Sequence, residues 1–186
     1  EMEENYREIK KAEPCLKLIN MDQVEVEKID WLLYPFIPYG KVTIIQGDPG
    51  EGKTTVVLQM IAKLTKGEAI LRDTTAEETK GEPINVIYQT AEDGLGDTIK
   101  PRLLAAGADC SRVMVIDDRD QPLTMVDARL EEAIIQTKAR LVVLDPIQGF
   151  LGSGIDMHRA NEIRPLMKRV AVLAEKYHCA IILIGH

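Results

Sequence analysis

The sequence predicts an α/β fold in which a mainly parallel β-sheet is covered by helices on both faces. After Gly40, short apolar runs alternate with longer amphipathic segments, which is the pattern of consecutive βα units. A glycine-rich loop separates the first apolar run from the first helix-forming stretch. The length of 186 residues fits one domain with an N-terminal extension.

Composition excludes two classes of protein. Hydrophobic residues make up 45% and charged residues 28% of the chain, which is ordinary for a folded protein and excludes a disordered one. No apolar run approaches the ~18–20 residues of a membrane span, so we expect no membrane partner. The net charge of −7 gives no support to nucleic-acid binding through bulk charge, although a local basic groove stays open. Scattered cysteines without CxxC spacing and the absence of a signal sequence predict a cytoplasmic protein.

Residues 1–20 are charge-rich and are broken by Pro14, which predicts an N-terminal extension or linker; a helix packed on the domain is the alternative. Residues 21–186 are expected to form the core domain, and residues 31–40 an edge hairpin and turn that lead into it. The chain stops directly after the apolar run 181–184, so we expect a C-terminally incomplete fragment that lacks later strands.

The core elements follow in order along the chain. Apolar runs predict strands at 41–46, 85–89, 112–116, 140–144 and 180–184. Amphipathic spacing predicts helices at 52–66, 98–106, 127–137 and 162–178, of which the last has the clearest apolar face. A polar stretch at 72–83 predicts a surface loop.

The glycine-rich loop carries the strongest motif. It consists of Gly47, Asp48, Pro49, Gly50, Glu51, Gly52, Lys53 and Thr54, and matches G-x-x-x-x-G-K-[ST], the Walker A pattern. In such a loop, backbone N–H groups and the start of the following helix hold the phosphates of ATP. Lys53 is expected to bridge the outer phosphates and the Thr54 hydroxyl to bind Mg²⁺, with Thr55 in the same turn.

Carboxylates at two strand ends are candidates for the chemistry. The apolar run 141–144 ends in Asp145, as in a Walker B strand that presents a carboxylate to the metal. Pro146 follows, so the glutamate that AAA+ and ABC ATPases usually carry there is missing. The strand at 85–89 is followed by Glu92, a candidate for polarising the attacking water; a solvated strand-end acid is the alternative. Asp93 is a candidate for the same water network or for a helix cap.

Four stretches together carry a family resemblance: WLLYPFIPYGKVTIIQGDPGEGKTT, VIYQTAEDGLGDTIKPRLLAAGAD, LVVLDPIQGFLG and CAIILIGH. They resemble the RepA-type branch of the RecA/DnaB superfamily, the hexameric replicative helicase ATPases of plasmids and phages. The resemblance covers residues 31–186 and implies a RecA-like P-loop NTPase fold.

The resemblance also implies roles for single residues. Lys53 and Thr54 match the phosphate-loop lysine and the metal-binding hydroxyl, Glu92 the catalytic glutamate, and Asp145 the Walker B aspartate. His186 matches a histidine that senses the γ-phosphate, with an incidental terminal residue as the alternative. Arg102 matches an arginine that acts on the nucleotide or on a neighbouring subunit, with a helix-surface cation as the alternative.

The implied function is Mg²⁺-dependent ATP hydrolysis that powers DNA unwinding or translocation by a hexameric homo-oligomer. Single-stranded DNA is then a partner, with the loop at 148–160 facing it; a metal-proximal loop without DNA contact is the alternative. Two other functions stay open: a recombination or repair ATPase of the RecA/RadA kind, and a nucleotide-gated assembly or regulatory module with little turnover. Because RecA-like helicases take an arginine finger from the adjacent subunit, we expect slow hydrolysis by the isolated fragment.

Overall fold

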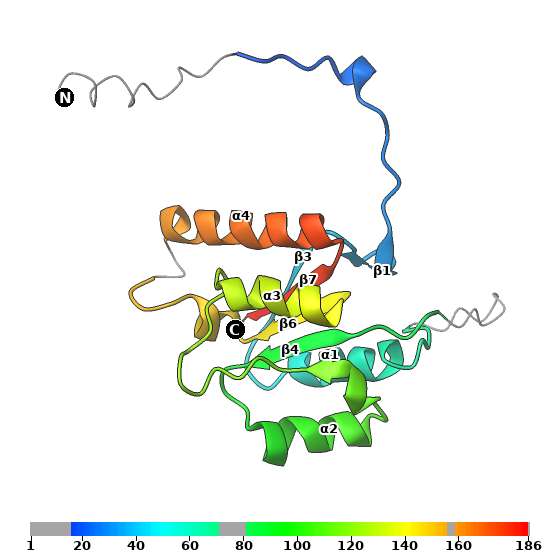
Figure 1. The fold of residues 1–186 in the computed structure, drawn as a ribbon, viewed down its shortest axis with the longest axis vertical. Helices are drawn as coiled ribbons and strands as arrows, with labels where there is room; N and C mark the ends of the chain where they lie inside the picture. The colour runs from blue at the N-terminus through cyan, green and yellow to red at the C-terminus, as the bar shows by residue number, and fades with distance from the viewer. Residues whose placement is uncertain (1–15, 71–80, 156–158, 186) are drawn as a thin grey trace.

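The computed structural model describes residues 16–70, 81–155 and 159–185 (Figure 1). Its centre is a five-stranded sheet in the order β3-β7-β6-β4-β5, in which every neighbouring pair is parallel. The strands are β3 (Val42–Gln46), β4 (Val86–Thr90), β5 (Val113–Met114), β6 (Leu141–Asp145) and β7 (Ala180–Gly185). The predicted α/β class with a parallel sheet is confirmed.

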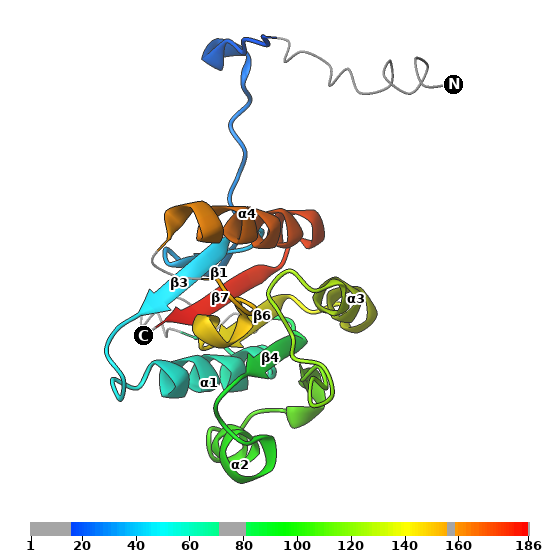
Figure 2. The same cartoon turned by 90° about the vertical axis from the view of Figure 1, so that its left-hand side faces the viewer.

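Helices cover both faces of this sheet (Figure 2). The helices are α1 (Lys53–Leu64), α2 (Lys100–Ala105), α3 (Ala128–Thr137) and α4 (Ala160–Tyr177). Along β6, Leu141 and Val143 pack into the apolar cluster with α1 and α2, whereas Val142 and Leu144 pack into the cluster with α3 and α4. This alternation of side chains is the period of a strand that is buried on both faces. Within the described residues, no helix has the length and apolar character needed to cross a bilayer.

Two elements differ from the sequence prediction. The strand expected at 112–116 is only Val113–Met114, because the Gln89 side-chain amide takes the place of a backbone partner for Ile116. It donates from Nε2 to the Ile116 carbonyl at 3.1 Å and accepts the Ile116 N–H at 3.0 Å. The helix expected at 98–106 begins earlier, as a π-helical stretch at Leu95–Ile99 that continues into α2.

The predicted edge hairpin is present as β1 (Trp31–Leu33) and β2 (Ile37–Pro38), which pair antiparallel. Residues 16–30 form an arm before it, with a 3₁₀ turn η1 at Met21–Gln23, and this arm leads away from the sheet and helices in both views (Figures 1 and 2). Residues 1–15 of the predicted extension, 72–80 of the predicted surface loop and 156–158 of the loop expected to face DNA lie outside the described residues.

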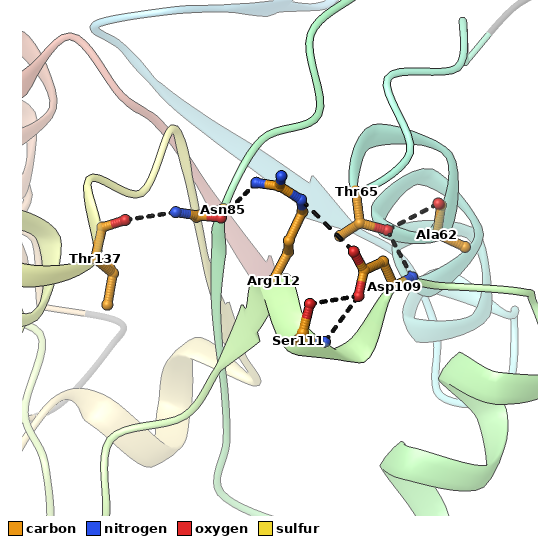
Figure 3. Close-up of polar contacts among 7 residues, drawn as sticks. All are labelled: Ala62, Thr65, Asn85, Asp109, Ser111, Arg112 and Thr137. Atoms are coloured by element: carbon orange, nitrogen blue, oxygen red, sulfur yellow. Dashed lines mark hydrogen bonds and ion pairs between the residues drawn. The ribbon is translucent and has the colours of Figure 1, made fainter.

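A polar network ties the fold together at the amino ends of β4 and β5 (Figure 3). Asn85 donates to the Thr137 carbonyl at the end of α3 at 2.7 Å and accepts from Arg112 at 3.1 Å. Arg112 lies 3.6 Å from Asp109, whose N–H donates to the Thr65 hydroxyl at the end of α1. These contacts join α1, α3, β4 and β5 at the edge of the sheet opposite the glycine-rich loop.

Candidate functional site

The loop at residues 47–52 connects β3 to the first turn of α1 and has the backbone of an anion cradle. Gly50 and Gly52 have φ of 83° and 82°, in the left-handed region that glycine adopts at little cost. Gly52 is the N-cap residue of α1, so the unpaired N–H groups of the first helical turn begin directly after it. Open space surrounds both glycines where a side chain would stand. Such a loop suits the approach of phosphate oxygens to the backbone.

Lys53 lies across this loop. Its side chain is 9% exposed, and its Nζ donates to the carbonyls of Gly47 at 2.6 Å and Asp48 at 2.7 Å. The Glu51 carboxylate folds over the loop and accepts the Asp48 N–H at 2.8 Å, and a Cβ at Gly47 would overlap this carboxylate. The loop therefore holds a nearly buried ammonium among oxygen acceptors.

Three side chains from different elements meet beneath the loop. The Thr54 hydroxyl, in the first turn of α1, donates to Oδ2 of Asp145 at 2.7 Å. The Tyr88 hydroxyl, from β4, donates to the same oxygen at 2.8 Å. Asp145 is 5% exposed and Tyr88 is fully buried. Because strand side chains alternate between faces, Tyr88 and Asp145 both face α1, and the two donors fix the carboxylate there.

The segment after β4 runs beside the end of β6. Thr90 pairs with Asp145 in the sheet register, and the Ala91 N–H donates to the Asp145 carbonyl at 3.0 Å. The Thr90 hydroxyl accepts the N–H groups of Glu92 and Asp93, at 3.4 and 3.1 Å, which turns the chain at the strand end. Glu92 is exposed at this edge of the sheet, one strand away from the end of β6.

Arg102 on α2 pairs with Asp93 at 3.6 Å, and its side chain is half exposed. From the sequence, Asp93 is a candidate for a helix cap or for the water network of Glu92. In the structure its carboxylate instead pairs with Arg102 on the following helix. His186 lies outside the described residues.

An AAA domain family model matches residues 10–186. The chain belongs to this AAA domain family. The DNA repair protein RadA of Streptococcus pneumoniae is 24% identical over 183 residues, which are 98% of this chain and 39% of that protein. RadA of Mycobacterium tuberculosis is 25% identical over 163 residues, which are 87% of this chain and 30% of that protein. The chain therefore spans about two-fifths or less of the length of these curated relatives.

Among solved structures, a KaiC-like protein from the archaeon Pyrococcus horikoshii OT3 superposes with a TM-score of 0.56 at 18% identity. The superposition covers 81% of this chain and 67% of that one. Fold and family together identify the chain as a RecA-like P-loop ATPase, as the sequence predicted.

The glycine-rich loop and the Thr54–Asp145 pair of this AAA domain fit the phosphates of a nucleotide and Mg²⁺. Hydroxyl and carboxylate oxygens, here from Thr54 and Asp145, are the ligands that Mg²⁺ prefers. The described part of the chain contains no group of three or more His, Cys, Asp and Glu side chains able to hold a metal. A metal at this site would take its remaining ligands from water and phosphate, which is the usual coordination of Mg²⁺.

Tyr88 is the site residue that sequence reasoning missed. Burial, reinforced by the Asp145 carboxylate, raises the pKa of the Tyr88 hydroxyl well above its ordinary value. The hydroxyl therefore stays protonated and acts as a donor to Asp145. The available signal is a tyrosine within the buried strand β4, at an alternate position that faces α1.

Proposed function

We propose that this chain binds MgATP and hydrolyses it, and that hydrolysis drives work on DNA. The observation that carries this proposal is the 2.7 Å hydrogen bond between Thr54 and Asp145. It joins the phosphate-loop helix to the end of β6, which is the pairing that a P-loop ATPase needs to hold its metal. Residues 21–186 are the ATPase core in this proposal and residues 1–20 an extension.

The residues have distinct roles. Lys53 and the backbone N–H groups of the loop bind the outer phosphates. Thr54 and Asp145 hold Mg²⁺, which when bound neutralises charge on the phosphates. Glu92 orients the attacking water and accepts its proton. His186 senses the γ-phosphate, and Arg102 acts on the nucleotide or on a neighbouring subunit in a homo-oligomeric ring.

Two kinds of DNA work are candidates. Both RadA relatives are described as DNA repair proteins, which supports a repair or recombination ATPase for this chain. The sequence resemblance to RepA-type proteins supports a hexameric replicative helicase that moves along single-stranded DNA. Unwinding of a forked duplex by the protein alone favours the helicase, and filament formation or acceptance of a duplex partner favours the repair ATPase.

The test is ATP turnover by the full-length protein with and without single-stranded DNA. Glu92→Gln should abolish DNA-stimulated turnover while MgATP binding persists, because the amide cannot accept the proton from water. Glu82→Gln, at an exposed acid in the segment before β4, is the matched control and should behave as wild type. Tight MgATP binding with negligible, DNA-indifferent turnover would contradict a motor and indicate a nucleotide-gated module.

A further inference from the structure

The arm at residues 16–30 exposes large apolar side chains that the AAA core leaves uncovered. Val26 is 99% exposed and Leu18 85%. The same holds, to a lesser degree, for Ile19, Met21, Val24 and Ile29, which are between 44% and 76% exposed. A contiguous series of exposed apolar side chains on one segment marks an interaction surface rather than a passive spacer.

The arm also has local order. Asn20 caps the 3₁₀ turn η1 by accepting the Asp22 N–H at 3.1 Å, and the turn closes with the Val24 N–H bonded to the Met21 carbonyl at 3.2 Å. From Val24 to Glu27 apolar and acidic residues alternate, which gives an extended segment one apolar and one acidic side. An ordered segment loses less conformational entropy when it docks.

The base of the arm is anchored, so its direction is set. The Asp30 carbonyl accepts the Tyr39 N–H at 2.9 Å, and the Asp30 carboxylate lies 3.1 Å from His178 Nε2 at the end of α4. Beyond this anchor the arm runs away from its own core in both views (Figures 1 and 2). Its exposed apolar side chains therefore stand clear of the core from which the arm leaves.

A complementary surface lies between α3 and α4. A pocket of about 380 Å³ there is lined by Val172 and Leu173 together with Lys168, Arg169, Lys176 and Glu131. Val172 is 54% exposed. The pocket lining therefore carries three basic side chains and one acidic side chain, whereas the whole chain has a net charge of −7. The pocket thus offers an apolar floor with a basic rim.

We propose that the arm of one copy docks into the α3–α4 pocket of a second copy. The arm segment carries Asp22, Glu25, Glu27 and Asp30 against Lys17 and Lys28, so its net charge opposes that of the basic rim. Its apolar side chains, Val24 and Val26 among them, cover Val172 and Leu173. Nothing in this inference depends on ATP hydrolysis.

Nucleic acid fits the pocket less well than the arm does. Glu131 stands inside the pocket, where it accepts from Lys176 at 2.8 Å and from the Tyr177 hydroxyl at 2.7 Å, which offsets one of the three cations that a polyanion would need. The described residues that line the pocket also include no aromatic ring on which a base would stack.

Charge reversal in the full-length protein tests the proposal. The arm variant carries Glu25→Lys and Glu27→Lys, and the pocket variant carries Lys168→Glu and Arg169→Glu. Sedimentation velocity without nucleotide or DNA measures the dissociation constant for self-association. Each variant alone should associate at least ~10-fold more weakly than wild type, because like charges then meet across the interface. An equimolar mixture should recover association, since each arm then meets a pocket of opposite charge.

The controls and the opposing results are specific. A chain with Glu82→Lys and Lys100→Glu, at exposed positions away from both surfaces, should associate as wild type, and all variants should melt at the same temperature. Mixing that restores nothing would overturn the proposal in favour of an arm folded onto its own pocket. Loss of single-stranded DNA binding in the pocket variant alone, with association unchanged, would overturn it in favour of nucleic acid.

Discussion

Replacing Tyr88 with phenylalanine isolates one of the contacts that fix the carboxylate of Asp145, the proposed Walker B residue. The ring stays and continues to fill its place in the core, and only the hydroxyl that donates to Asp145 at 2.8 Å is removed. A buried hydrogen bond to an ionised group contributes about 1.5–3 kcal/mol. With a urea dependence of roughly 2 kcal/mol per molar, the unfolding midpoint should fall by about 1 M.

The same variant should change metal binding. A residue that holds a metal-binding carboxylate by a hydrogen bond typically changes metal affinity by about 10-fold or more. The gain in ADP affinity on adding Mg²⁺ should therefore shrink about 10-fold, whereas ADP binding in EDTA should match wild type. Fluorescence titration of a labelled ADP in the two buffers separates the two effects.

Tyr177→Phe is the control for this experiment. It also removes a hydroxyl that donates to a carboxylate, that of Glu131 at 2.7 Å, but on the surface between α3 and α4. Its unfolding midpoint should change less and its Mg²⁺ response not at all. An unchanged midpoint and an unchanged Mg²⁺ response in Tyr88→Phe would refute the reasoning, because Asp145 would then keep its position without the hydroxyl.

Three further predictions address other parts of the fold. Lys53→Met removes the ammonium from the loop and should weaken ADP binding about 10- to 100-fold in the same titration, and an unchanged affinity would contradict the phosphate role. Gly149→Ala places a Cβ against Ala91 and should cost about 1–3 kcal/mol in urea unfolding, with Ala91→Gly recovering most of the loss; absence of recovery would contradict the overlap. Burial raises the pKa of the Cys179 thiol from 9.0 to about 11, so the folded state keeps a proton that the unfolded state releases. The contribution of this proton to the free energy of unfolding is complete below pH 9. The free energy of unfolding should therefore fall by about 1 kcal/mol between pH 9 and 10, and Cys179→Ala should remove this fall. An equal fall in that variant would assign it to other groups.

The sequence predicts well those features that depend on neighbours along the chain. The helix expected at 127–137 is observed at Ala128–Thr137, and the strand expected at 41–46 at Val42–Gln46. The phosphate loop is equally local, because its glycines, lysine and threonine are all within eight consecutive residues. In these cases periodicity and local backbone preference decide the structure without help from distant residues.

Features that depend on distant partners escape such reasoning. Tyr88 and Asp145 are 57 positions apart, and only the β4–β6 pairing and the shared face bring them together. The short β5 results from the side-chain amide of Gln89, 27 positions from Ile116, which no local pattern reports. The Arg102–Asp93 pair spans the π-helical stretch at Leu95–Ile99, an element that apolar spacing does not predict.

The arrangement of polar groups along the sheet separates stability from chemistry. At the amino ends of the strands, Asn85, Arg112 and Asp109 bond mainly to one another and to helix ends, so their hydrogen-bonding capacity serves the fold (Figure 3). At the carboxyl ends, the Thr54 and Tyr88 donors converge on Asp145, and the loop glycines face open space. A parallel sheet allows this division because all its strands end at one edge. Substitution of Asn85 should therefore lower the urea midpoint of unfolding and leave nucleotide affinity unchanged. Lys53→Met should instead weaken nucleotide affinity, so a nucleotide titration and a urea unfolding curve together distinguish the two edges of the sheet.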